Sequence, residues 1–301
     1  MTSKPTPANW ASIFALGFIW GGTFMVVRTA LDGYGPLTVA ASRTTLGAVA
    51  LLSVMFVLRR PFPEFSRRMV KYLVVIGILN TALPFALLSW GQQYVPSAFA
   101  GISMAALPLF VLPLAHIFTD EKLSMRNALG VMLGFVGALV LIGPSVLKIG
   151  TGLEPLGQLA CIAASISYAV SSIMTRRCPP IDPITMAALL LAVGSIALLP
   201  AMLFFEGIPT IADPRTTWAI ILLGLVPTAL AALLRVTTIR SAGAVFMTLV
   251  NYQVPVWSMI LGVLVLSEVL PIRFFAALAL ILTGLAISQW SSLRRLMTRR
   301  G

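Results

Sequence analysis

The segment 107–123, LPLFVLPLAHIFTDEKL, is matched 147 residues later by the segment 254–270, VPVWSMILGVLVLSEVL. Both segments read proline, twelve other residues, glutamate, one residue and leucine. The same 147-residue offset relates further residues along the chain: Pro36 and Pro183, Thr38 and Thr185, Gly47 and Gly194, Gly77 and Gly224, Pro108 and Pro255, Glu121 and Glu268, Leu123 and Leu270, Arg126 and Arg273, Gly137 and Gly284. A single offset that includes proline, glutamate and arginine is difficult to produce from apolar composition alone. The pattern predicts a duplicated chain with halves 1–147 and 148–301.

The composition predicts that this chain is embedded in lipid. Hydrophobic residues make up 58% of its 301 residues and charged residues only 10%, and the mean hydropathy is +0.97. A soluble domain is typically about one-quarter charged, and a membrane-spanning helix needs about 20 apolar residues. The expected fold is an all-α integral membrane protein with ten transmembrane helices, at 9–30, 36–58, 69–91, 96–118, 124–143, 155–175, 183–205, 215–239, 241–266 and 271–292.

The distribution of basic residues predicts how the chain is oriented. Lysine and arginine concentrate in cytoplasmic loops of membrane proteins. In this chain they fall in the loops after even-numbered spans and in the C-terminal tail, and the largest group lies between spans two and three: Arg59, Arg60, Arg67, Arg68 and Lys71. Both termini are therefore predicted to be cytoplasmic. The net charge of +12 is explained by this topology, and no nucleic-acid partner is expected.

The loop charges also predict that the two halves are inverted. Each half has five spans, and because five is odd the second half enters the membrane in the opposite sense. The basic loop between spans two and three corresponds to a loop that carries Glu206, Asp213 and only Arg215. Conversely, Arg176 and Arg177 lie in a loop whose counterpart, after the first span, is nearly uncharged. Inverted repeats are typical of secondary transporters.

The doubled motif also carries a family resemblance. It occurs together with the stretch Ile19-Trp20-Gly21-Gly22-Thr23-Phe24 in the first span and Arg43 in the second. With these residues the chain resembles, over essentially its whole length, the ten-helix EamA-type branch of the drug/metabolite transporter superfamily, and within it the bacterial aromatic amino-acid exporters. The resemblance implies alternating access around a central pocket lined by helices 1, 3, 4, 6, 8 and 9. It also implies export of amino acids across a bacterial inner membrane.

Polar and aromatic side chains at mid-depth mark the candidate pocket. Inverted-repeat transporters bind substrate near the midplane, beside interrupted helices, and an amide without a partner costs several kcal/mol in hydrocarbon. The expected substrate-binding residues are Trp20, Thr23, Asn80, Tyr168, Ser171, Asn251, Tyr252 and Gln253, together with the repeated prolines Pro108 and Pro255. The alternative is that the polar groups join helices to one another.

The charged residues inside or beside the spans suggest distinct roles. Arg43 is a candidate contact for a substrate carboxylate, or else for a backbone carbonyl, whereas Arg235 is expected to snorkel toward the interface. Glu121 and Glu268 lie at helix ends, and their repetition suggests a structural role. None of the nine acidic residues falls at mid-depth of a span. No carboxylate-based proton site is therefore expected, and a quaternary-cation drug is disfavoured as substrate.

Other classes of protein fit the sequence less well. A Ser103–His116 pair for an intramembrane enzyme would span thirteen residues of one helix, roughly 20 Å. No P-loop or metal-ligand pattern is present, so no catalytic residue, metal or cofactor is expected. A carrier of nucleotide sugars or other phosphorylated metabolites would need several cavity-facing cations. A carrier of drug-like amphiphiles and a channel stay open as alternatives.

Two small-residue motifs predict close helix packing but leave the oligomeric state open. Gly17 and Gly21 form one Gly-x3-Gly pair, and Gly130 and Gly134 form another. Such pairs let helix backbones approach closely. We expect them to serve packing within a monomer first, and a dimer contact second.

Overall fold

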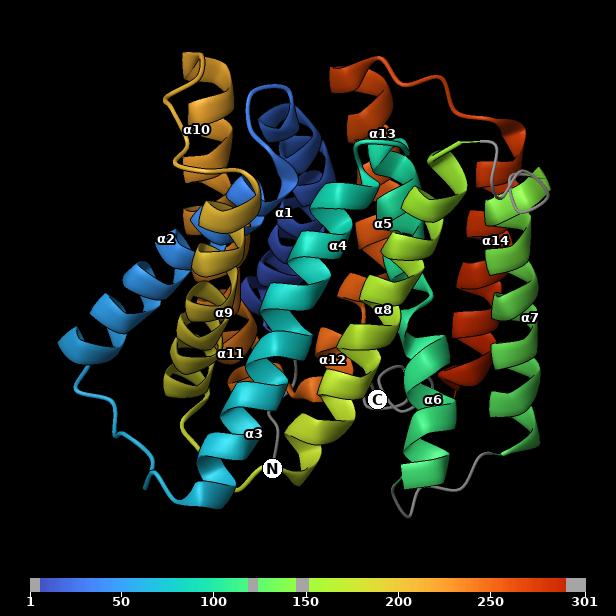
Figure 1. The fold of residues 1–301 in the computed structure, drawn as a ribbon. Helices are drawn as coiled ribbons and strands as arrows, with labels where there is room; N and C mark the ends of the chain where they lie inside the picture. Colours follow the sequence, from blue (N-terminus) through green and yellow to red (C-terminus); the bar gives the residue numbers. More distant parts are fainter. Residues whose placement is uncertain (1–5, 119–123, 145–151, 291–301) are drawn as a thin grey trace.

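A computed structural model describes residues 6–118, 124–144 and 152–290 as a bundle of helices without β-strands in these ranges (Figure 1). Eight helical segments are long and apolar enough to cross a membrane: Pro7–Leu31 (α1), Pro36–Val57 (α2), Arg67–Gly91, Ser97–Phe118, Met125–Ile142 (α7), Glu154–Arg177 (α8), Pro183–Phe205 (α9) and Pro214–Ala242. Two shorter apolar helices follow, Val250–Leu266 (α13) and Ile272–Ser288 (α14). Each has 17 residues, which is about the minimum for a membrane span. The chain is thus a multi-pass membrane protein.

The third and eighth segments each contain a π-helical stretch at equivalent positions. The third consists of Arg67–Gly77 (α3), Ile78–Ala82 (η1) and Leu83–Gly91 (α4), and the eighth of Pro214–Leu223 (α10), Gly224–Leu230 (η3) and Ala231–Ala242 (α11). Pro84 is the second residue of α4, which follows η1, and Pro227 lies within η3. Proline cannot donate the regular helical hydrogen bond, and wider turns of this kind recur at functional sites. Both stretches lie near the middle of their segments.

The fourth and ninth segments are divided, whereas each was expected as one continuous helix. The helix Ser97–Ala105 (α5) is followed by the turn residue Ala106. The next helix, Leu107–Phe118 (α6), has Pro108 in its first turn. The missing donor of Pro108 accounts for this interruption. In the ninth segment Ala244–Met247 (α12) precedes the break, and α13 then continues through Pro255. The proline at the repeated position therefore interrupts one helix but not the other.

Helix starts follow ordinary capping chemistry. Prolines open several helices, where the missing amide hydrogen has no intrahelical partner to lose. Within the described residues, N-cap side-chain oxygens accept hydrogen bonds from backbone amides of the first turn at five helix starts: Thr6, Ser66, Ser124, Asp182 and Asp213. These caps satisfy donors that would otherwise be unpaired at the membrane surface.

The helices α2 and α9 are antiparallel and are joined at both ends. At one end Arg60 and Arg240 lie 3.7 and 3.2 Å from the carboxylate of Asp182. Burial raises the pKa of Asp182, but amide hydrogen bonds and these two arginines outweigh it and hold the pKa below its usual value. At the other end the carboxylate of Glu206 accepts hydrogen bonds of 2.8 Å from the backbone amides of Leu37 and Thr38.

The helices α7 and α14 are also antiparallel and approach each other through glycines. A Cβ added at Gly130 would lie 2.5 Å from the carbonyl oxygen of Gly284. Along the interface, Gly137 packs against Ile281, one turn earlier in α14. The Gly130 and Gly134 motif thus packs inside the chain, against α14 and Leu109. The Gly17 and Gly21 motif likewise packs against α13. Figure 1 shows α7 and α14 side by side at one edge of the bundle.

One helix contact is made twice, 147 residues apart. Gly77 packs against Val193 and the carbonyl of Leu190 in α9, and Gly224 packs against Leu46 and the carbonyl of Arg43 in α2. All three pairs of equivalent residues, 77 and 224, 46 and 193, and 43 and 190, are separated by the same offset. The same contact is thus made by the second segment with the eighth and by the seventh segment with the third.

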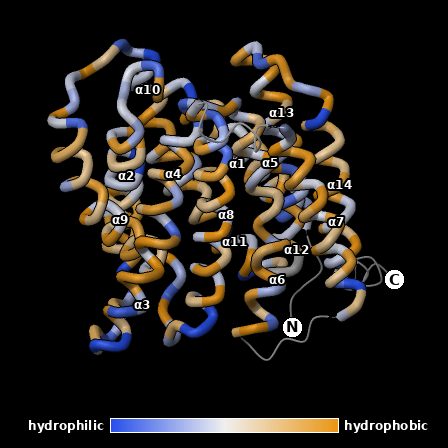
Figure 2. Tube along the Cα trace, turned by 45° about the vertical axis from the view of Figure 1, so that its right-hand side comes forward, coloured by the Kyte–Doolittle hydropathy of each residue, from blue (hydrophilic) through white to orange (hydrophobic). Residues whose placement is uncertain are grey.

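The buried apolar side chains form two large clusters, one around α1, α5, α8 and α13 and one around α2, α4 and α9. Large hydrophobic side chains also cover the outside of the bundle. Phe204 and Leu264, for example, are 83% and 74% exposed. Figure 2 shows hydrophobic residues along the flanks and hydrophilic residues concentrated at the two ends. This arrangement suits a bundle whose flanks face hydrocarbon.

Candidate central site

Two side chains cross from one half to the π-helical stretch of the other. The indole Nε1 of Trp20 in α1 donates to the carbonyl oxygen of Pro227 at 3.2 Å. The hydroxyl of Ser167 in α8 donates to the carbonyl oxygen of Leu79 at 2.7 Å. Trp20 and Ser167 are themselves 147 residues apart, and their acceptors Leu79 and Pro227 are 148 residues apart, so the two bonds are counterparts to within one residue. The acceptor carbonyls belong to η3 and η1, respectively. These stretches lie near the middle of the bundle, where the regular helical hydrogen-bonding pattern is interrupted.

Arg43 is the charged side chain at the centre of this region. It is only 8% exposed. Its Nε donates to the hydroxyl of Thr228 at 2.9 Å, and its guanidinium carbon lies 3.9 Å from the centroid of the Phe85 ring. Tyr168 lies near it. Among the described residues no carboxylate forms an ion pair with Arg43, so its charge is balanced here only by dipoles and an aromatic face.

Glycines set the position of Arg43 against η3. A Cβ added at Gly47 would lie 2.6 Å from the methyl group of Thr228, and one added at Gly224 would contact Leu46 and the carbonyl of Arg43. The hydroxyl of Thr228 in turn donates to the carbonyl oxygen of Leu223 at 2.8 Å. Because this bond uses the hydroxyl hydrogen, the hydroxyl oxygen of Thr228 acts as the acceptor for Nε of Arg43.

A second polar pair lies on the third and sixth segments. The hydroxyl of Ser171 in α8 donates to Oδ1 of Asn80 in η1 at 3.1 Å. Tyr168 lies one turn before Ser171, and its ring packs against both apolar clusters. Tyr168 thus lies where the two clusters meet. We define the central site as Trp20, Arg43, Asn80, Phe85, Tyr168, Ser171 and Thr228.

The remaining expected pocket residues have other surroundings. The hydroxyl of Thr23 donates to the carbonyl of Ile19 in its own helix, which satisfies it locally. Gln253 packs against Gly17 of α1, and Tyr252 keeps a buried hydroxyl without a partner in the described structure. Asn251 is half-buried at the start of α13. Within the described part of the chain, none of these residues is hydrogen-bonded to Arg43.

The repeated prolines are both buried, Pro108 at the α5–α6 break and Pro255 within α13. Glu268 follows a left-handed residue, Ser267, at the end of α13 and accepts hydrogen bonds from the amides of Ser97 and Ala98 at 2.7 and 3.2 Å. It therefore caps α5. Its counterpart Glu121 lies outside the described residues.

The other residues singled out from the sequence lie on α5, α6 and α11. Arg235 is on the exposed side of α11. Ser103 in α5 donates to the carbonyl oxygen of Ala100 at 2.7 Å, which gives its hydroxyl a partner within the same helix. His116 lies further along the segment, in α6.

Sequence reasoning missed Thr228, Phe85 and Ser167. A signal for Thr228 was available, because Thr81 is its counterpart at the 147-residue offset. Thr81 donates to the carbonyl oxygen of Leu190 at 3.3 Å, and Leu190 is the counterpart of Arg43. No comparable signal marked Phe85, which is one of many phenylalanines in apolar runs.

Comparison with known proteins matches this fold to transporters. The model of the EamA-like transporter family matches residues 10–143 and 155–289. The uncharacterized transporter YoaV of Bacillus subtilis is 24% identical, over 94% of this chain and 97% of its own. The uncharacterized inner membrane transporter YedA of Escherichia coli is 26% identical, over 84% of this chain and 81% of its own.

Two further proteins are similar along most of the chain. A probable terminal-alkyne amino-acid exporter of Streptantibioticus cattleyicolor is 25% identical, over 89% of this chain and 88% of its own. A solved crystal structure with 19% sequence identity superposes with a TM-score of 0.64 and covers 96% of this chain and 99% of that one. The fold is thus one already seen in a solved structure.

Proposed function

Because this chain belongs to the EamA-like transporter family, we propose that it exports small metabolites, most directly amino acids with aromatic or hydrophobic side chains, by alternating access around the central site. The relatives are transporters and not enzymes. A bacterial inner membrane is the proposed location, in line with the inner membrane relative. The amino-acid class is in line with the name of one distant relative and rests mainly on the chemistry of the site.

Arg43 is the observation that carries this proposal. A buried guanidinium is costly unless an anion or several dipoles compensate it. Thr228 occupies its Nε, and among the described residues its guanidinium donates to no other group. The terminal nitrogens are the part of arginine that binds a carboxylate with two parallel hydrogen bonds. We assign them to the α-carboxylate of the substrate.

The surrounding groups suit the rest of a zwitterion. Trp20, Phe85 and Tyr168 supply aromatic surface for an apolar side chain. Oδ1 of Asn80 and the carbonyls of η1 and η3 are acceptors near mid-depth, where they can bind an ammonium group. All seven acidic residues in the described ranges lie at helix ends or in loops. The ammonium is therefore assigned to neutral oxygens, and we infer no carboxylate-based proton site.

The alternative substrates fit this chemistry less well. A nucleotide sugar carries two phosphates and would require several cations in the cavity. Arg43 is the one cationic residue of the central site. A cationic drug would face the same positive charge without a carboxylate to bind it. A drug-like amphiphile that carries a carboxylate stays compatible with the site. A channel would conduct without the saturation that a binding site imposes.

Alternating access requires two halves that move against each other, and we infer inverted repeats 1–147 and 148–301 with both termini in the cytoplasm. The antiparallel pairs α2 with α9 and α7 with α14 support inversion, because in each pair the two helices are counterparts at the 147-residue offset. The counterpart bonds of Trp20 and Ser167 support it as well. A monomer contains the whole central site, and a dimer stays an open alternative.

The test is transport in proteoliposomes with matched substrates and variants. We expect saturable uptake of phenylalanine and leucine and weak uptake of phenylalaninamide, which lacks the carboxylate. Arg43→Gln removes a charge-assisted hydrogen bond pair worth about 1.5–3 kcal/mol, so KM for phenylalanine should rise about 10- to 150-fold. Arg235→Gln, which also removes one positive charge but lies on the exposed side of α11, is the control and should leave KM unchanged.

Two outcomes would overturn the proposal. Transport of none of the amino acids would remove the substrate class, while the fold would be unaffected. Equal losses for phenylalanine and phenylalaninamide in Arg43→Gln would show that Arg43 acts on helix packing rather than on a carboxylate. Nucleotide sugars, cationic dyes and single-channel recordings complete the substrate panel.

A further inference from the structure

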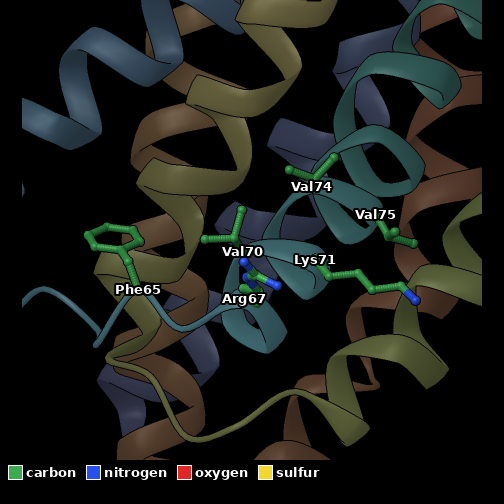
Figure 3. Close-up of a pocket in the computed structure, with 6 residues that line it drawn as sticks. All are labelled: Phe65, Arg67, Val70, Lys71, Val74 and Val75. Atoms are coloured by element: carbon green, nitrogen blue, oxygen red, sulfur yellow. The ribbon is translucent and has the colours of Figure 1, made fainter.

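A groove of about 420 Å³ runs along the outer side of α3, away from the central site. It is lined by Phe65, Arg67, Val70, Lys71, Val74 and Val75 (Figure 3). Four of these residues, at positions 67, 70, 71 and 74, have the spacing of one helix face. The opposite face, with Met69, Leu73 and Ile76, is buried in a core cluster. The groove therefore lies on the side of α3 that faces away from the protein.

The groove combines a cationic end with an apolar end. Arg67 and Lys71 lie in the first turns of α3, and Val74 lies further along, with Val70 between them (Figure 3). Val70, Val74 and Phe65 are exposed. In the described part of the chain neither cation forms an ion pair, and no acidic side chain lines the groove. Glu64, the acid nearest in sequence, is exposed in the preceding loop.

We propose that this groove binds an anionic phospholipid. The anionic phosphate of the headgroup lies on Arg67 and Lys71, and an acyl chain lies along Val70 and Val74, with Phe65 beside it. Five basic residues lie in the loop before α3 and in the first turns of α3: Arg59, Arg60, Arg67, Arg68 and Lys71. This region is predicted to be cytoplasmic, where anionic lipids attract lysine and arginine. A zwitterionic lipid also carries a phosphate but brings its own ammonium, which the two cations repel, and a free anion would leave the apolar wall uncovered. The inference depends on the protein being membrane-embedded and not on its substrate.

The binding test is native mass spectrometry of the full chain with phosphatidylglycerol and phosphatidylcholine of identical acyl chains. Each cation near an anionic lipid contributes about a fivefold preference, so the double variant Arg67→Gln/Lys71→Gln should lose about 25-fold of the preference for phosphatidylglycerol. The matched control is Arg59→Gln/Arg68→Gln. It has the same net charge, and its exchanged side chains lie on the same side of the membrane but do not line the groove. This control should keep the preference.

A third variant separates a lipid from a soluble anion. Val74→Trp fills the apolar end of the groove and keeps both cations. It should weaken binding of phosphatidylglycerol but leave any binding of glycerol phosphate unchanged. Equal binding of the two phospholipids to the unmodified chain, or equal losses in the groove variant and its control, would overturn the proposal. So would binding of glycerol phosphate as strong as that of the lipid. Thermal unfolding of each variant checks that it folds.

Discussion

Gly284 in α14 is the position where we expect one added methyl group to reveal the helix packing most directly. A Cβ there would lie 2.5 Å from the carbonyl oxygen of Gly130, 2.7 Å from the amide nitrogen of Gly134 and 3.1 Å from its Cα. All three are backbone atoms. No side-chain rotation can therefore relieve the contact, and α7 and α14 must move apart.

The expected cost follows from that geometry. Ordinary van der Waals contact of a Cβ begins at 3.4 Å, so relief of the closest contact requires a separation of about 0.9 Å. Overpacking of this size typically costs about 1–3 kcal/mol. We expect Gly284→Ala to lower the free energy of unfolding by about 2 kcal/mol, measured by reversible unfolding with sodium dodecyl sulfate in mixed micelles.

The matched control is the same substitution at Gly152. A Cβ there has no atom within 4 Å. Gly152→Ala shares the reduced conformational freedom of the unfolded chain, which by itself stabilises by about 0.4–1 kcal/mol. The control should therefore be unchanged or slightly more stable. If Gly284→Ala proves as stable as Gly152→Ala, the two helices do not approach through these glycines, and the packing described for α7 and α14 is wrong.

Two further predictions concern helix caps. Glu268→Ala removes the acceptor for two amides at the start of α5 and should lower the free energy of unfolding by about 0.5–2 kcal/mol; Glu64→Ala, an exposed loop acid, is the control, and equal effects would contradict the cap. Asp182 has a pKa below its usual value in the folded protein, so the stability it contributes is present above about pH 4 and is lost as the pH falls through the lowered pKa. Asp182→Asn should flatten the fall of the melting temperature between about pH 5 and pH 3, and an unchanged slope would contradict the assignment.

The sequence predicted how deep a residue lies in the membrane better than it predicted which way the side chain points. Span boundaries follow from apolar length, so the positions of Trp20, Asn80 and Tyr168 near the middle of their segments could be anticipated. Direction is harder, because lipid and protein interior are both apolar and the periodicity that marks a buried face in a soluble helix is weak here. Thr23 therefore entered the candidate pocket alongside Trp20, although its hydroxyl is bonded within its own helix.

The helix interruptions also show which features the sequence predicts and which depend on tertiary packing. A proline predicts that a hydrogen bond is missing, but the neighbouring helices decide how the chain accommodates the loss. Pro108 follows a one-residue interruption at Ala106, Pro227 lies in a π-helical stretch, and Pro255 lies inside a helix. Pro108 and Pro227 both lie in largely apolar sequence, so the difference between these two arises from tertiary packing, whereas Pro255 follows the polar residues 251–253. This is also why the acceptor role of the Pro227 carbonyl could not be predicted.

The duplication itself gives the strongest argument about where chemistry resides. The glycines and threonines that set the central geometry occur in both halves: Gly47 and Gly194, Gly77 and Gly224, Thr81 and Thr228. The guanidinium does not, because the counterpart of Arg43 is Leu190. The glycines and threonines that occur in both halves serve the helix packing that the halves share. Arg43 occurs in one half only, so that shared packing does not require its charge. Its burial without a carboxylate among the described residues is therefore better explained by a ligand than by the fold.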